Sequence, residues 1–138
     1  MDIKTFSVTS AFKNVSSVCF ILKTFCDENS VPSEKTREIE LSLAEALNNI
    51  IKHAYKCDET NKIEIKIKHE NDRIELELTD YGEARTNLNK PKLDFDPDDV
   101  NSLPEGGMGL FIIEQLMDKN HYRRAGNKNI FTLVKNVN

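Results

Sequence analysis

Three polar residues recur at intervals of four in the middle of the chain: Glu45, Asn49 and His53. On a helix they share one stripe, because each residue advances the chain by about 100°. A carboxylate one turn from an amide can serve a single site, since the carboxylate can accept a proton and the amide oxygen is a ligand suited to Mg²⁺. The same stripe is also compatible with a solvated polar face, and His53 with a structural hydrogen-bonding role.

A second candidate patch is Asp80-Tyr81-Gly82, which follows an apolar alternating segment. An aspartate at the end of a strand can accept a hydrogen bond from a ligand amino group, and a glycine there lets the backbone approach that ligand closely. Asp-x-Gly is also favourable turn chemistry, so the pattern alone leaves both interpretations open.

The third candidate patch is Gly107-Met108-Gly109-Leu110, at the start of a helical pattern. Free backbone N–H groups at a helix N-terminus, reinforced by the helix dipole, form an anion site suited to phosphates. A hinge or a close packing contact would also explain the glycines. Neither Gly-x-Gly-x-x-Gly nor Gly-x-x-x-x-Gly-Lys-Ser/Thr occurs, which disfavours dinucleotide-binding and P-loop folds.

Hydrophobic periodicity predicts the elements that must position these patches. Spacings of three and four predict helices, and alternation predicts strands, some paired as hairpins. The predicted strands are 3–8, 63–67, 74–78, 121–124 and 129–134, and the predicted helices are 11–27, 33–56 and 107–117. Together they indicate one α+β domain over residues 1–138, a two-layer sandwich with helices on one face of a mixed, mostly antiparallel sheet.

The pattern dissolves between residues 81 and 105, a stretch that holds three of the four prolines. A loop of that length inside a domain is usually functional. Asp96-Pro97-Asp98-Asp99 has the form of an N-cap followed by proline, so we expect one short helical turn there.

Composition excludes several classes of protein. A net charge of -4, from 19 Lys+Arg and 23 Asp+Glu, argues against a nucleic-acid partner. No apolar run is long enough to span a membrane and the N-terminus has no signal-peptide core, so we expect no membrane partner and a cytoplasmic location. Cys19, Cys26 and Cys57 lack zinc-site spacing and are predicted to be buried free thiols.

The order and spacing of the three patches resemble those of the GHKL ATPase family. Its N box is similar to the segment from Glu45 to Asn49, its G1 box to Asp80-Tyr81-Gly82, its G2 box to Gly107–Leu110, and its ATP lid to residues 81–106. More narrowly, residues 44–56, 103–118 and 129–135 are similar to segments of the bacterial anti-sigma-factor kinases. The common G1 pattern continues to a second glycine, where this chain has Ala84.

The resemblance implies a Bergerat-type ATP-binding fold with ATP and Mg²⁺ as cofactors. It implies that Glu45 is the catalytic base, that Asn49 holds Mg²⁺ on the phosphates, and that Asp80 receives the adenine amino group with support from Thr132. The remaining nucleotide contacts that it implies are His53, Gly82, Gly107, Met108, Gly109 and Leu110.

The activity implied by the resemblance is a serine/threonine protein kinase that phosphorylates an anti-anti-sigma (antagonist) protein, sequesters a sigma factor and acts as a homodimer. The 138 residues offer no phosphoacceptor helix ahead of this domain, so we do not expect a complete sensor histidine kinase. One alternative is a nucleotide-gated partner-binding regulator without kinase activity, although the retention of Glu45 and Asn49 argues against it. Another is a stand-alone ATPase fragment of the chaperone or topoisomerase kind.

Overall fold

The alternating segments form a five-stranded sheet in the computed structural model, which describes residues 1–84 and 108–138. The strands are β1 (Asp2–Thr9), β2 (Lys62–Glu70), β3 (Arg73–Asp80), β4 (Lys119–Ala125) and β5 (Lys128–Asn136). Their order is β1-β2-β3-β5-β4, and all four neighbouring pairs are antiparallel. The mostly antiparallel sheet is therefore confirmed, although the described part of the chain contains no parallel pair that would make it mixed.

The two faces of the sheet differ sharply in polarity. On β2 and β3 the apolar residues of the alternating pattern are buried, and the charged residues between them are half-buried on the other face. Neighbouring strands pair charges there, as between Lys68 and Glu75, whose Nζ and Oε2 lie 3.5 Å apart. Burial of each large aliphatic side chain contributes about 1.5–3 kcal/mol, so this alternation fixes which face receives the helices.

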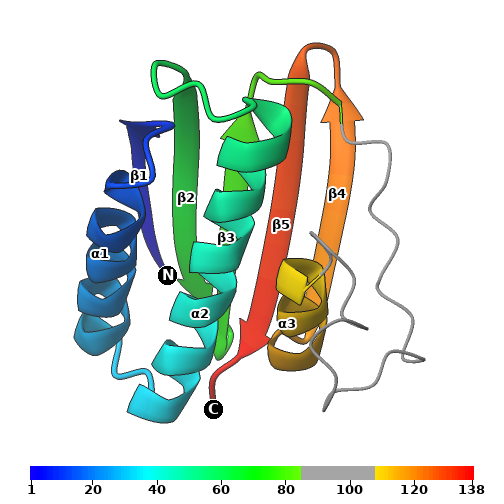
Figure 1. Ribbon diagram of the computed structural model, residues 1–138. Helices are drawn as coiled ribbons and strands as arrows, with labels where there is room; N and C mark the ends of the chain where they lie inside the picture. The colour runs from blue at the N-terminus through cyan, green and yellow to red at the C-terminus, as the bar shows by residue number, and fades with distance from the viewer. Residues whose placement is uncertain (85–107) are drawn as a thin grey trace, which may run out of the picture.

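Three helices of the described ranges cover the apolar face: α1 (Asn14–Glu28), α2 (Ser33–Asn49) and α3 (Met108–Leu116). Figure 1 shows α1 beside β1, α2 across the middle of the sheet, and α3 over β5 and β4. On α2, the residues Ile39, Leu43 and Leu47 recur at spacings of four and are almost completely buried. The α+β two-layer arrangement with helices on one face is confirmed.

The helix predicted for residues 33–56 is not α-helical to its end. The α-helix ends at Asn49 and continues as a π-helical turn, Ile50–Ala54, in which Tyr55 N donates to Ile50 O at 3.1 Å. Lys56 and Cys57 then adopt positive φ values of 50° and 64° and end the helical segment. Wide π turns inside helices are rare and often occur at functional sites.

Other boundaries differ by a few residues from the prediction. The first helix begins at Asn14 rather than at residue 11, and β4 and β5 extend beyond the predicted strands. The turn between β4 and β5 is formed by Gly126 and Asn127, and Gly126 takes the φ of 61° that a two-residue hairpin loop requires. The helical turn predicted at residues 96–99 lies outside the described residues.

The three cysteines do not share one environment. Cys19 and Cys26 are buried as predicted, and burial raises the pKa of each thiol to about 11. The prediction was wrong for Cys57, which follows the π-helical turn and is exposed. Within the described ranges, no helix is long and apolar enough to cross a membrane.

Candidate functional site

Asp80 is a buried carboxylate at the last position of β3, only 2% exposed and on the sheet face that carries the helices. Its Oδ1 accepts hydrogen bonds from Gly82 N at 3.0 Å and from Asn129 Nδ2 at 2.7 Å. Within residues 1–84 and 108–138, no hydrogen bond reaches Oδ2. The geometry therefore holds one carboxylate oxygen and leaves the other for an incoming donor.

Gly82 is required by the close packing of this turn against the end of the α2 segment. A Cβ on Gly82 would lie 2.3 Å from Ala54 O, a distance that no side chain tolerates. The next residue, Glu83, donates its N–H to the same Ala54 carbonyl oxygen at 3.0 Å. The close approach that the sequence predicted for a ligand is thus made, in this structure, to the protein backbone.

Tyr55, which follows the π-helical segment, makes a further hydrogen bond to the same turn. Its buried hydroxyl accepts a hydrogen bond from Tyr81 N at 2.7 Å and donates to Lys62 O at 2.5 Å. Burial raises the pKa of the Tyr55 hydroxyl above its usual value. The π-helical turn and the aspartate turn are therefore joined by both backbone and side-chain hydrogen bonds.

The hairpin of β4 and β5 holds the turn from the opposite side. Asn129 is the register partner of Asp80, and its Nδ2 also donates to Glu83 O at 2.9 Å. Arg124 Nη1 donates to Gly82 O at 2.8 Å. Neither residue was predicted from the sequence, since only the strand register places Asn129 opposite Asp80.

The structure does not bring Thr132 to Asp80. Thr132 pairs with Glu77 on β3 and with His121 on β4. It lies three positions from Asn129 on the same strand, and side chains alternate between faces, so Thr132 points to the face opposite the helices. Within the described residues, the β5 side chain that contacts Asp80 is Asn129.

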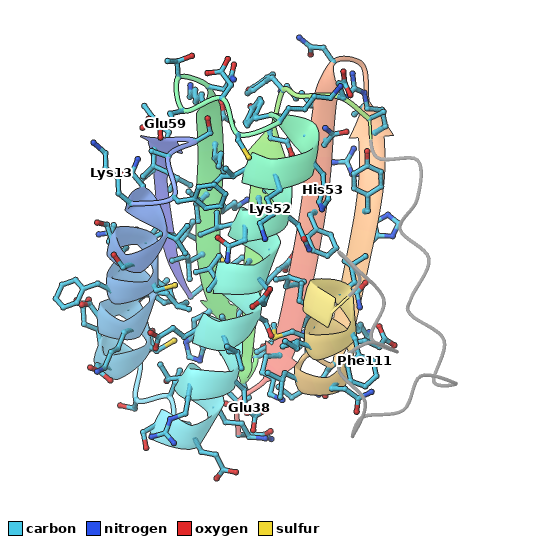
Figure 2. The ribbon with its side chains drawn as sticks, viewed as in Figure 1. Lys13, Glu38, Lys52, His53, Glu59 and Phe111 are labelled. Atoms are coloured by element: carbon cyan, nitrogen blue, oxygen red, sulfur yellow. The ribbon has the colours of Figure 1, made fainter. Side chains whose placement is uncertain are left out.

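The three polar residues of the long helix lie in different environments. Asn49 is only 9% exposed, and no hydrogen bond of its amide occurs within the described part of the chain. Glu45 is half-buried one turn earlier, and His53 is exposed on the π-helical turn, as Figure 2 shows together with Lys52. The amide is not among the fully buried, unpaired side-chain groups of the described residues, so it keeps contact with solvent and can meet an external ligand.

The glycine-rich patch is described only in part. Met108 and Gly109 are the first residues of α3, and Leu110 is half-buried against the core. Gly107 and the rest of the predicted lid beyond Ala84 lie outside the described residues. Ala84 itself is exposed.

Lys135 links strand β5 to the helices α2 and α3. Its ammonium lies 2.6 Å from Glu38 Oε2 on α2, and it also donates to Leu116 O at the end of α3. The Lys135 side chain is 9% exposed, so this ion pair is largely shielded from water. One lysine of β5 therefore connects α2, which carries Glu45 and Asn49, with α3, which begins at Met108.

Several known proteins are similar to this chain in sequence. Residues 8–135 match the family model of the histidine kinase-like ATPase domain. The serine-protein kinase RsbW of Oceanobacillus iheyensis is 37% identical over 89 residues, covering 62% of this chain and 56% of that protein. RsbW of Bacillus subtilis is 30% identical over 90 residues, covering 62% and 56%. The aligned part thus spans little more than half the length of these relatives.

Solved structures show the same fold at low sequence identity. The crystal structure of the RsbU and RsbW domains of a Mycobacterium tuberculosis protein gives a TM-score of 0.71 at 14% identity, covering 99% of this chain and 33% of that one. The SiaB-SiaC complex from Pseudomonas aeruginosa gives 0.61 at 12% identity, covering 96% and 87%. At these identities the likeness extends to the fold alone.

Proposed function

The chain belongs to the histidine kinase-like ATPase domain family, and from this premise we propose that it is a serine/threonine protein kinase that phosphorylates an anti-anti-sigma protein. The observation that carries the proposal is the buried carboxylate of Asp80, with Oδ1 held by two donors. Its other oxygen is suited to the amino group of an adenine base. The names of the RsbW relatives support the reaction type.

Asn49 is the residue we propose to hold Mg²⁺, and its environment fits that role. The residue is 9% exposed, and its amide makes no hydrogen bond to the described residues and offers a hard oxygen ligand. When bound, the ion would supply positive charge to the nucleotide phosphates. His53, exposed one turn later, would add a contact to them, as would the backbone of Met108, Gly109 and Leu110 at the start of α3, together with Gly107.

Glu45 is the proposed catalytic base. It would accept the proton of the acceptor hydroxyl while that oxygen forms a bond to the γ-phosphorus, and the bond from phosphorus to the β,γ-bridging oxygen breaks to release ADP. Glu45 lies on α2 one turn before Asn49 and is half-buried, so its carboxylate can meet a protein substrate from solvent. Positioning and charge stabilisation supply most of the catalysis in such transfers.

We also propose that the kinase acts in the cytosol as a homodimer and sequesters a sigma factor. The proposal rests on the likeness to RsbW kinases over the region they share. The antagonist would then be the phosphoryl acceptor, and its modification would leave the sigma factor bound.

Substitution of the proposed base gives the direct test. Glu45→Ala should lower phosphoryl transfer from labelled ATP to the antagonist protein by at least about 100-fold, because general-base catalysis is lost. ATP affinity, measured by calorimetry, should change little, since Glu45 is not assigned to the nucleotide. Full transfer by this variant would refute the role of Glu45. ATP-dependent retention of the partner by the wild-type protein without any transfer would favour the nucleotide-gated binding module.

A further inference from the structure

The side-chain amide of Asn129 contacts the whole turn that begins at Asp80. Its Nδ2 donates to Asp80 Oδ1 at 2.7 Å, to Glu83 O at 2.9 Å and, at the longer distance of 3.3 Å, to Gly82 O. Asn129 is only 1% exposed, so water does not compete for these hydrogen bonds. One side chain thus holds the carboxylate of Asp80 and the backbone carbonyls of Gly82 and Glu83.

The amide of Asn129 has only one favourable orientation. Its Oδ1 accepts hydrogen bonds from the Tyr122 hydroxyl at 2.5 Å and from Arg124 Nη1 at 3.0 Å. A flipped amide would place its NH₂ group against these donors and its oxygen against the carboxylate of Asp80. The hydrogen-bond network therefore directs the donor end at Asp80.

This arrangement determines what Asp80 can recognise. With Oδ1 held by Asn129 and by the N–H of Gly82, the carboxylate cannot rotate freely, and Oδ2 stays available as an acceptor. A carboxylate acceptor matches an amino group at position 6 of a purine and opposes a carbonyl oxygen at the same position. Charge-assisted hydrogen bonds of this kind are stronger than neutral ones.

We propose that Asn129 is a positioning residue that sets the preference of the site for 6-aminopurine over 6-oxopurine nucleotides by fixing the carboxylate of Asp80. The inference rests on the proposed function, because it requires that a nucleotide base meets Asp80. It extends that function by assigning base selection to a residue of β5 that contacts Asp80 and not the nucleotide itself.

The test compares nucleotides that differ only at position 6 of the base. Calorimetry would measure the affinity of the full chain for ATP, for GTP and for purine riboside triphosphate, which lacks the 6-amino group. Asn129→Ala should weaken ATP binding about tenfold, the effect of one charge-assisted hydrogen bond, and change binding of purine riboside triphosphate by no more than about twofold. The preference for ATP over GTP should shrink by the same factor as the affinity for ATP.

Asn136→Ala is the matched control, since Asn136 is an exposed residue at the far end of β5 that pairs with Arg73. It should leave all three affinities unchanged. Asn129→Thr, which keeps one donor, should give an intermediate ATP affinity and serves as the readout if Asn129→Ala does not fold.

Two results for Asn129→Ala would overturn the inference while leaving the kinase proposal intact, provided that the wild-type protein binds ATP. One is an equal loss of affinity for ATP and for purine riboside triphosphate, and the other is no loss of affinity for either nucleotide. Failure of the wild-type protein to bind any of the nucleotides would overturn the proposed function as well.

Discussion

The turn from Asp80 to Glu83 is held by residues from two elements, the end of the α2 segment and strand β5. Ala54 and Tyr55 contact it from the end of the α2 segment, and Asn129 contacts it from β5. Because several hydrogen bonds from two elements converge on it, one of them fully buried, the turn has little freedom to move relative to the helix. The position of the Asp80 carboxylate is therefore a property of the surrounding residues as much as of the aspartate.

Gly82→Ala should damage both stability and nucleotide binding. The new Cβ would lie 2.3 Å from Ala54 O, so the turn must move away from the helix, and we expect the free energy of unfolding to fall by about 1–3 kcal/mol. ATP affinity should fall as well, because the displaced turn carries Asp80. Urea denaturation and calorimetry measure the two effects.

Gly126→Ala is the control for this substitution. Gly126 has a φ of 61°, and a Cβ added there would have no neighbouring atom within 4 Å, so alanine introduces backbone strain of about 1 kcal/mol without a clash. Its ATP affinity should equal that of the wild type. If Gly82→Ala bound ATP normally, the close packing against Ala54 would have no part in the site.

At the residue scale, the sequence predicted Asp80 and Asn49 because each carries chemistry visible in a local pattern. It did not predict Asn129, whose role depends on the pairing register between β3 and β5. The family resemblance implied Thr132 as the supporting residue of β5, which is three positions away and therefore on the other face. Register follows from tertiary pairing, which a local pattern in one sequence does not reveal.

At the element scale, apolar periodicity predicted the three helices and the strands β2, β3 and β5 of the described ranges, because burial of one face dominates each of them. The edge strands β1 and β4 are mostly exposed, and the sequence placed them only approximately. The π-helical turn Ile50–Ala54 was not predicted, since its apolar residues fit an ordinary α-helix equally well. Its carbonyl at Ala54 accepts the N–H of Glu83, so the departure from α-helix is stabilised by a contact with a distant segment. Long-range contacts of this kind leave no periodic signal.

Lys135→Met should loosen α3 relative to α2. The substitution keeps the aliphatic volume but removes the ammonium that pairs with Glu38 and caps Leu116 O. We expect the free energy of unfolding to fall by about 2 kcal/mol, because a largely buried ion pair and a helix-terminal hydrogen bond are lost together. Urea denaturation measures the change, and hydrogen exchange should show faster exchange in α3.

Lys62→Met offers the matched comparison on the surface. Lys62 Nζ lies 3.3 Å from Glu64 Oε1, but the two side chains are 60% and 38% exposed. An exposed pair contributes little, so stability should change by less than about 1 kcal/mol. Equal effects of the two substitutions would mean that Lys135 is no more than a surface charge.

At the scale of the whole molecule, the core lies between one apolar sheet face and the helix layer, and the opposite face carries charged residues. Cys19 and Cys26 lie in this core on α1, and Tyr55 lies at its edge. These groups are neutral when protonated and are buried, so folding favours their protonated forms. The stability of the whole domain is thereby coupled to alkaline pH.

The expected pH dependence follows from the direction of these shifts. Burial raises the pKa of Cys19 and Cys26 from 9.0 to about 11, so the folded state keeps protons that the unfolded state releases. Their contribution to stability is complete below about pH 9 and is lost as pH rises toward 11, with a limiting slope of about 1.4 kcal/mol per pH unit for each thiol. Urea denaturation at pH 8 to 11 measures that slope.

The double variant Cys19→Ala/Cys26→Ala should be less stable at pH 8, because it leaves space in the core, but its stability should decline less steeply above pH 9. Cys57→Ala is the control, since it removes a thiol from the surface and leaves both core thiols in place, so its slope should match that of the wild type. A decline equally steep in the double variant would show that other groups set the alkaline limit. In that case the thiols would matter to this domain only as apolar volume.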